Sequence, residues 1–219
     1  MKPTGESVAA AAVQAVGVGY TYDEMDCQAF VEHCVKQAGG EMAYSGSNDM
    51  ARNAVWLGTL QNAKAAGKLV PGAGMLIHED TEANLPAKYR GDGLGDFSHV
   101  GLYVGENALT DTDKNGQKRS CNVVHSSSSM GRVAGSTLKN GWTHVMWFPE
   151  IDYGVDVQPG VEIGAEISQD TTADSNGAEG GLTAGTPAAS AGRYATVVSP
   201  DGNPVKLRKT ASQKESVYW

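Results

Sequence analysis

The order in which two kinds of periodicity follow one another is the strongest constraint on this fold. Residues 4–56 carry helical patterns, whereas residues 74–148 contain short β-rich runs separated by Gly, Asp and Asn. The β-rich runs are GMLIH (74–78), SHVGLYVG (98–105), NVVHSS (122–127) and THVMWF (143–148). Helices followed by strands predict an α+β fold, in which N-terminal helices pack on an antiparallel β-sheet.

Three helices are predicted before the strands. The first covers Thr4–Val16, and the third begins near Asn48 or Asp49 and runs through Trp56. The second follows Asp26, a good N-cap residue, and runs to Ala38, just before two glycines. The apolar positions of this second helix recur with the spacing of one helical face, which predicts a buried stripe: Cys27, Phe30, Val31, Cys34, Val35 and Ala38.

Charge and composition divide the chain into three segments. Residues 1–153 carry 12 Lys and Arg against 17 Asp and Glu, residues 154–192 carry six acids and no base, and residues 193–219 carry five bases and two acids. The middle segment is rich in Gly, Ala, Ser and Thr, which is typical of a flexible linker. We therefore expect a domain at 1–153, a linker at 154–192 and, at 193–219, the opening of a β-rich module too short to fold alone.

Several classes of protein are excluded by the composition. The net charge of −8 argues against a nucleic-acid partner. Three cysteines, Cys27, Cys34 and Cys121, are too few and too irregularly spaced for a disulfide framework. No CxxC or His/Cys spacing of the zinc-site kind occurs, so we expect no metal and no cofactor. No run is apolar enough for a signal peptide or a membrane span, so we expect no membrane insertion.

The position of Cys27 allows two interpretations. A cysteine on an apolar helical stripe is usually a small core residue. At a helix N-terminus, the unpaired N–H groups can instead stabilise a thiolate, and a neighbouring protonated histidine would complete a thiolate–imidazolium pair. A nucleophile needs a base nearby, and strand ends at His99 and His125 could face the helix terminus. The spacing permits this geometry without deciding it, whereas Cys34 and Cys121 are expected to be structural.

Four motifs occur together in a fixed order: DCQAFV, SHVGLYVG, VVHSSSSMGRV and GWTHVMWF. In this combination the chain closely resembles the NlpC-type cysteine peptidases that hydrolyse bacterial cell wall, across most of residues 5–150. The resemblance implies a papain-like α+β fold with the cysteine helix packed against the sheet. It also implies a triad in which Cys27 is the nucleophile, His99 the base and His125 the residue that orients the base.

The resemblance further implies which residues surround the triad. In that family a tyrosine upstream of the nucleophile contacts the reacting carbonyl region, and here we favour Tyr22 over Tyr20 for this role. The other candidate substrate contacts flank the triad positions: Asp26, Gln28 and Ser98. Gln28 stands where the family usually has serine, which would alter the subsite for the stem peptide.

An insertion of twenty residues, HEDTEANLPAKYRGDGLGDF (78–97), precedes the predicted base. One interpretation is an ordinary surface loop. Because of its position, the insertion could instead form a wall of the cleft. In that case Tyr89, Arg90 and Asp92 would be candidate substrate contacts.

The function implied by the resemblance is cleavage of peptidoglycan stem peptides, at the bond between D-γ-glutamate and the diamino acid, through a thioester. The tail from Tyr194 resembles the opening of a bacterial SH3-like cell-wall-binding domain. We expect a monomeric wall hydrolase that reaches the bacterial cell wall by secretion, its leader removed, or by phage-type release as an endolysin. The alternatives are an N-acetylmuramoyl-L-alanine amidase, an acyltransferase and a non-catalytic wall-binding protein.

Overall fold

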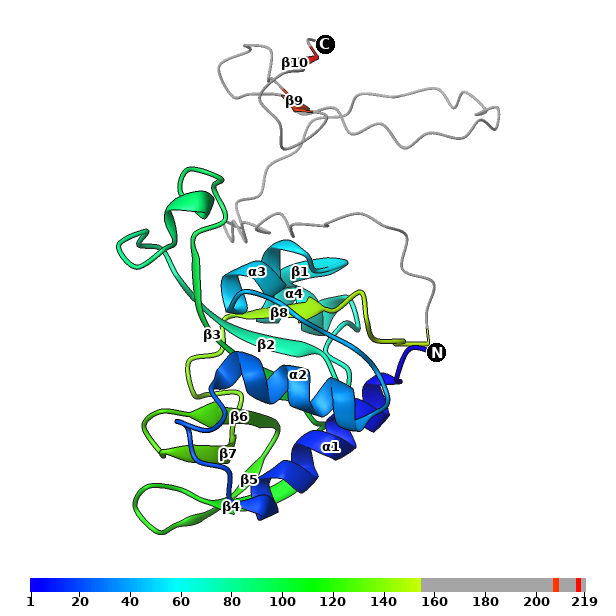
Figure 1. The fold of residues 1–219 in the computed structure, drawn as a ribbon, viewed down its shortest axis with the longest axis vertical. Coiled ribbons are helices and arrows are strands. Elements are labelled where there is room, and N and C mark those ends of the chain that lie inside the picture. Colours follow the sequence, from blue (N-terminus) through cyan, green and yellow to red (C-terminus); the bar gives the residue numbers. More distant parts are fainter. Residues whose placement is uncertain (155–206, 209–215, 218–219) are drawn as a thin grey trace, which may run out of the picture. The chain divides into compact units, whose positions relative to one another are not determined.

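The computed structural model describes residues 1–154, 207–208 and 216–217. Residues 1–154 form a mixed α+β unit, in which helices pack on a six-stranded antiparallel sheet (Figure 1). This confirms the predicted α+β class. In a second unit, β9 (Leu207–Arg208) pairs antiparallel with β10 (Ser216–Val217). The rest of the predicted linker and SH3-like segment lies outside the described residues.

The first unit contains four α-helices and eight strands. The helices are α1 (Gly5–Val18), α2 (Cys27–Gln37), α3 (Ser47–Arg52) and α4 (Leu60–Ala65), with a 3-10 turn η1 (Ala87–Tyr89). The strands are β1 (Trp56–Thr59), β2 (Gly74–Glu79), β3 (Asp96–Tyr103), β4 (Leu109–Thr112), β5 (Lys118–Cys121), β6 (Val123–Ser127), β7 (Arg132–Ser136) and β8 (His144–Trp147). The sheet has the order β1-β8-β2-β3-β6-β7, and β4 and β5 form a separate hairpin. None of the helices described is long and apolar enough to cross a bilayer.

Side-chain caps fix where the first two helices begin. The Thr4 hydroxyl oxygen accepts the Ser7 N–H at 3.2 Å, and the Asp26 carboxylate accepts the Ala29 N–H at 2.8 Å. Each cap satisfies one of the N–H groups that a helix leaves unpaired at its start. The prediction that Asp26 caps the cysteine helix is confirmed.

The apolar stripe of α2 is buried for most of its length. Its central members, Phe30, Val31, Cys34 and Val35, are fully buried. They share a core with β3, in which Val100 and Leu102 are also fully buried. Full burial of one such apolar side chain contributes about 1.5–3 kcal/mol. The half-buried first residue, Cys27, therefore lies where this core meets the surface.

The structure differs from the predicted helix boundary near Trp56. The third helix ends at Arg52, and Trp56 instead begins β1, where it pairs with Trp147 of β8. The Trp56 indole is 5% exposed and packs in a second core cluster with other tryptophans. Burial against the sheet overrides the helical pattern at this position.

Candidate active site

The loop before α2 is tied to β6 and to the turn that follows it, and this fixes the position of Cys27. The Tyr22 N–H donates to the Gly131 carbonyl at 2.9 Å, at the start of β7. The Ser126 hydroxyl, on β6, donates to the Met25 carbonyl. These two bonds hold the chain on either side of the helix cap. Cys27 therefore begins its helix against the strands that carry the two predicted histidines.

The protonation of Cys27 is governed by burial. Burial raises the pKa of the thiol, and the neighbouring Asp26 carboxylate raises it further. Hydrogen bonds from backbone N–H groups, first that of Val100, oppose this rise but do not outweigh it. The helix N-terminus thus stabilises the thiolate as expected, yet the resting group at neutral pH is a thiol.

A β-bulge sets the direction of His99. Phe97 pairs with His78 and His99 pairs with Ile77, so Ser98 is an extra residue on β3 at this step. Bulges bend a strand and change where the following side chains point. Ser98 itself is exposed, and His99 is placed directly before the residue whose N–H bonds the Cys27 sulfur.

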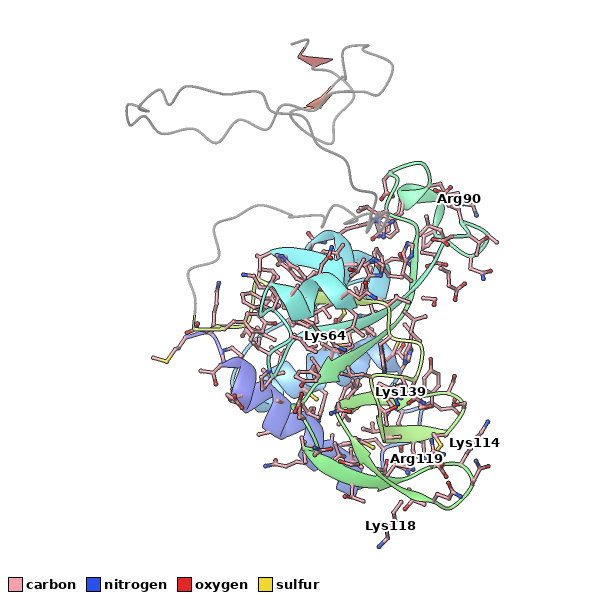
Figure 2. All side chains as sticks on the ribbon, turned by 180° about the vertical axis from the view of Figure 1, so that it is seen from behind. Lys64, Arg90, Lys114, Lys118, Arg119 and Lys139 are labelled. Atoms are coloured by element: carbon pink, nitrogen blue, oxygen red, sulfur yellow. The ribbon has the colours of Figure 1, made fainter. Side chains whose placement is uncertain are left out.

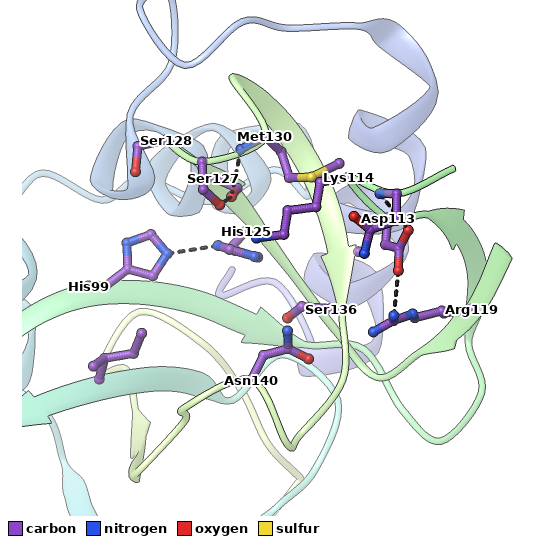
Figure 3. A pocket seen from close by; sticks show the side chains of 14 residues that line it. His99, Asp113, Lys114, Arg119, His125, Ser127, Ser128, Met130, Ser136 and Asn140 are labelled. Atoms are coloured by element: carbon purple, nitrogen blue, oxygen red, sulfur yellow. Dashed lines mark hydrogen bonds and ion pairs between the residues drawn. The ribbon is translucent and has the colours of Figure 1, made fainter. Parts of the chain in front are cut away.

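His99 and His125 form a hydrogen-bonded pair across neighbouring strands. Their Nε2 and Nδ1 atoms are 2.7 Å apart (Figure 3). Burial lowers the pKa of His99, and burial together with the charge of His99 lowers the pKa of His125 to about 3. Both rings are therefore neutral at pH 7. When His99 carries its proton on Nε2 and donates it to His125, its Nδ1 lone pair is free to act as a base.

Trp142 packs against both histidines and was not among the residues predicted from the sequence. Its ring stacks on His99 with centroids 5.6 Å apart and meets His125 edge-on at 5.2 Å. The indole N–H donates to the Ser136 hydroxyl at 3.1 Å. Gly101 makes room for this cluster, because a Cβ there would lie 2.9 Å from both His125 and Trp142. Trp142 and Gly101 thus fix the orientation of the pair.

A cleft of about 420 Å³ opens beside the histidine pair (Figure 3). Its walls are the β6–β7 turn, the tip of the β4–β5 hairpin and the loop before Trp142. The lining residues are Ile77, His99, Asp113, Lys114, Asn115, Arg119, His125, Ser127, Ser128, Ser129, Met130, Gly135, Ser136 and Asn140. Cys27 is not among them, so of the three predicted triad residues only the two histidines line the cleft.

The two candidate tyrosines occupy different places. Burial raises the pKa of Tyr22, and the neighbouring Cys27 (when ionised) and Asp26 raise it further, so Tyr22 lies beside Cys27 as a protonated hydroxyl. Tyr20 instead packs edge-on against His33 of α2, with ring centroids 5.2 Å apart. Of the two, Tyr22 is the one that the fold brings to the thiol.

The other candidate substrate contacts do not line the cleft. The Gln28 side-chain amide donates to Glu32 at 3.0 Å and to the Tyr44 carbonyl, which ties α2 to the segment before α3. Asp26 is engaged as the helix cap, and Ser98 is the exposed residue of the bulge. These three side chains therefore support the backbone around Cys27 and His99 and do not face the cleft.

The insertion at 78–97 is anchored to α3. The Tyr89 hydroxyl donates to Asp49 at 3.0 Å, and the Arg52 guanidinium lies 4.3 Å from the Tyr89 ring centroid. Arg52 also forms an ion pair with Asp92 at 2.7 Å. None of Tyr89, Arg90 and Asp92 lines the cleft. Of the two interpretations of the insertion, the contacts of these residues favour the surface loop, and residues of the β4–β5 hairpin line the cleft instead.

No three His, Cys, Asp or Glu side chains within the described ranges are grouped to hold a metal ion. No protein-family model matches this chain, and no curated protein or solved structure matches it either. The chemistry that the site offers is that of its own side chains. They are a half-buried thiol at a helix N-terminus, a neutral imidazole held by a second one, and an adjoining polar cleft.

Proposed function

We propose that this chain is a peptidoglycan hydrolase, a papain-like cysteine endopeptidase of the NlpC type acting on the bacterial cell wall. The observation that carries the proposal is the 2.7 Å His99–His125 hydrogen bond beside Cys27 at the start of α2. A cysteine nucleophile needs a base and a third group that orients the base, and in this proposal Cys27, His99 and His125 take these three roles. The four motifs of the sequence support the substrate class, a peptidoglycan stem peptide cut after D-γ-glutamate.

The proposed first half-reaction begins from a neutral thiol and a neutral imidazole. His99 Nδ1 accepts the thiol proton while the Cys27 sulfur attacks the carbonyl carbon, which forms a C–S bond and an oxyanion. The Cys27 N–H and the Tyr22 hydroxyl are the candidate donors to that oxyanion. The C–N bond then breaks as His99 returns the proton to the leaving amine, and a thioester remains on Cys27.

The second half-reaction releases the acyl group. His99 accepts a proton from water, whose oxygen attacks the thioester. The C–S bond then breaks as His99 returns this proton to the Cys27 sulfur, and the acid product releases its remaining proton to solvent as a carboxylate. Throughout the cycle the neutral His125 ring accepts the hydrogen bond from His99 Nε2. This acceptor keeps the base in one orientation and stabilises it when it is protonated. In this proposal the segment 193–219 would hold the enzyme on the wall.

The proposal is tested by mass spectrometry of the soluble fragments released from purified peptidoglycan. The expected products are new D-glutamate carboxylates and free diamino-acid amines from the wild-type chain, and none from Cys27→Ala. Cys34→Ala is the matched control, because it removes a thiol from the same helix face but far from the N-terminus. Intact stem peptides freed from muramic acid would establish an amidase instead, and the absence of any product would contradict catalysis.

A further inference from the structure

Cations gather around the cleft although the chain carries a net charge of −8. Lys114 and Arg119, from the β4–β5 hairpin, both line it. Figure 2 shows Lys114, Lys118 and Arg119 together at the end of the first unit that carries this hairpin. The cleft therefore offers positive charge beside the histidine pair.

The hairpin that carries these cations is clamped to the sheet. The Asp111 carboxylate on β4 binds two nitrogens of Arg132 on β7, at 3.0 and 3.1 Å. It also accepts the Gly135 N–H at 2.8 Å. Burial alone would raise the pKa of Asp111, but these donors hold it below its ordinary value, so the clamp stays ionised. The hairpin is thus a fixed wall of the cleft.

The tip of the hairpin is ordered by Asp113, which accepts the N–H groups of Asn115 at 2.8 Å and Gln117 at 3.0 Å. Lys114 lies inside this turn, so its direction is set by the turn. Figure 3 shows its side chain extending into the cleft on the side where His125 lies. The wall and its tip together place one ammonium group at the mouth of the site.

Of the two cations, Lys114 is the one free to bind a ligand. Arg119 forms an ion pair with Asp113 at 2.5 Å. In the part of the chain that the structure describes, no ion pair includes Lys114. Hydroxyl and amide groups of Ser128 and Asn140 line the same cleft. An ammonium with neighbouring hydroxyl and amide donors suits a carboxylate.

The position of the cleft relative to the triad indicates which part of the substrate enters it. His99 returns its proton to the leaving amine, so the group attached to that amine lies on the histidine side of the thiol. The cleft is lined by His99 and His125 but not by Cys27. We infer that this cleft is the subsite for the leaving part of the substrate and that Lys114 binds a carboxylate there. The inference rests on the proposed function.

The test uses three peptides of the form L-alanyl-γ-D-glutamyl-diaminopimelate. In the first peptide both diaminopimelate carboxylates are free. In each of the other two, one of these carboxylates is amidated. The comparison shows which of the two carboxylates Lys114 binds. Binding to the 219-residue chain carrying Cys27→Ala is measured by calorimetry, alone and with Lys114→Gln. Lys118→Gln is the matched control, because Lys118 belongs to the same hairpin but does not line the cleft.

We expect amidation of one carboxylate to weaken binding about three- to tenfold, a modest effect because Lys114 is exposed. The loss should vanish in Lys114→Gln, persist in Lys118→Gln and shrink at high salt. Equal binding of all three peptides, no binding of any, or an equal effect of both lysine variants would overturn the inference. If the peptides bind as expected but the wild-type chain cleaves none, the proposed function fails while the carboxylate subsite stands.

Discussion

Two pairs of histidines lie on the same sheet with almost the same separation. The ring centroids are 5.0 Å apart for His99–His125 and 4.9 Å apart for His78–His144. Each pair also packs against an aromatic side chain, and burial is the first cause of the lowered pKa of His99, His125 and His144. By distance and burial alone, the two pairs would be equally good candidates for catalysis.

The difference lies in the partner of each ring nitrogen. His99 and His125 bond one another, whereas His78 Nε2 faces the Leu94 carbonyl at 3.0 Å and His144 Nδ1 faces the Thr143 hydroxyl at 3.1 Å. The first pair also adjoins a thiol and a cleft. Only in the first pair does one imidazole fix the orientation of the other, which is what the proposed mechanism requires of a base and its orienting residue. The second pair serves instead to pack the base of the insertion.

The largest effect should follow removal of the base. His99→Ala is expected to lower kcat/KM for a stem peptide at least about a thousandfold, because in the proposed mechanism His99 is the group that takes the Cys27 proton. His144→Gln, in the other pair, should remain within about twofold of wild type. Peptide cleavage followed by chromatography measures both. An equal loss of kcat/KM in His99→Ala and His144→Gln, when both variants have the circular dichroism spectrum of the wild type, would contradict the proposed difference between the two pairs.

Loss of the orienting histidine should cost less. His125→Ala is expected to lower kcat about a hundredfold, since His99 keeps its position but loses the acceptor at Nε2. His125→Asn should recover part of that loss, because an amide oxygen can accept the same hydrogen bond. If His125→Asn is no more active than His125→Ala, His125 acts by packing alone and not as a hydrogen-bond acceptor.

The pH dependence distinguishes a neutral pair from a thiolate–imidazolium pair. His99 acts as a base only when neutral, so cleavage should fall as pH drops through its pKa, which lies below 6.5. The Cys27 pKa lies above its ordinary value of 9.0, so alkylation by iodoacetamide should rise about tenfold per pH unit up to that range. Alkylation that is already maximal near neutral pH would contradict the neutral pair.

Among His99, His125 and Trp142, the tryptophan should have the smallest effect on activity. Trp142→Leu is expected to lower kcat about five- to tenfold with little change in KM, because the histidine rings lose the surface that holds them. Trp56→Leu, in the same core cluster, should lower the unfolding temperature comparably without lowering kcat. Parallel losses of kcat in both variants would assign Trp142 a purely structural role.

Local chemistry made the helix that begins at Cys27 predictable. Asp26 as cap, the apolar stripe that follows it and the closing glycines are all encoded within residues 26–40, and the structure places the helix accordingly. The strands carrying His99 and His125 were also predicted, because their apolar residues are contiguous in sequence. The side-by-side arrangement of the two histidines was implied only by the family resemblance.

Features that depend on contacts between distant residues were not predictable. The β4–β5 hairpin has polar, exposed strands, and its place beside the cleft is set by the Asp111–Arg132 clamp. Trp142 was visible in the sequence, but its contact with both histidines depends on strand pairing and on a glycine at position 101. For the insertion, the sequence left a surface loop and a cleft wall as alternatives, and only the contact of Asp92 with Arg52 of α3 shows where the insertion is held.

The central claim, that Cys27 carries the acyl group during the reaction, is tested most directly by acid quenching. The chain is mixed with a stem peptide and quenched with acid within the first turnovers. It is then digested, and the mass of the fragment that contains Cys27 is measured by mass spectrometry. The account predicts an added L-alanyl-D-glutamyl group on Cys27 as a thioester, which is lost on return to neutral pH. Rapid peptide cleavage with no acyl group on Cys27, at any quench time, would contradict it.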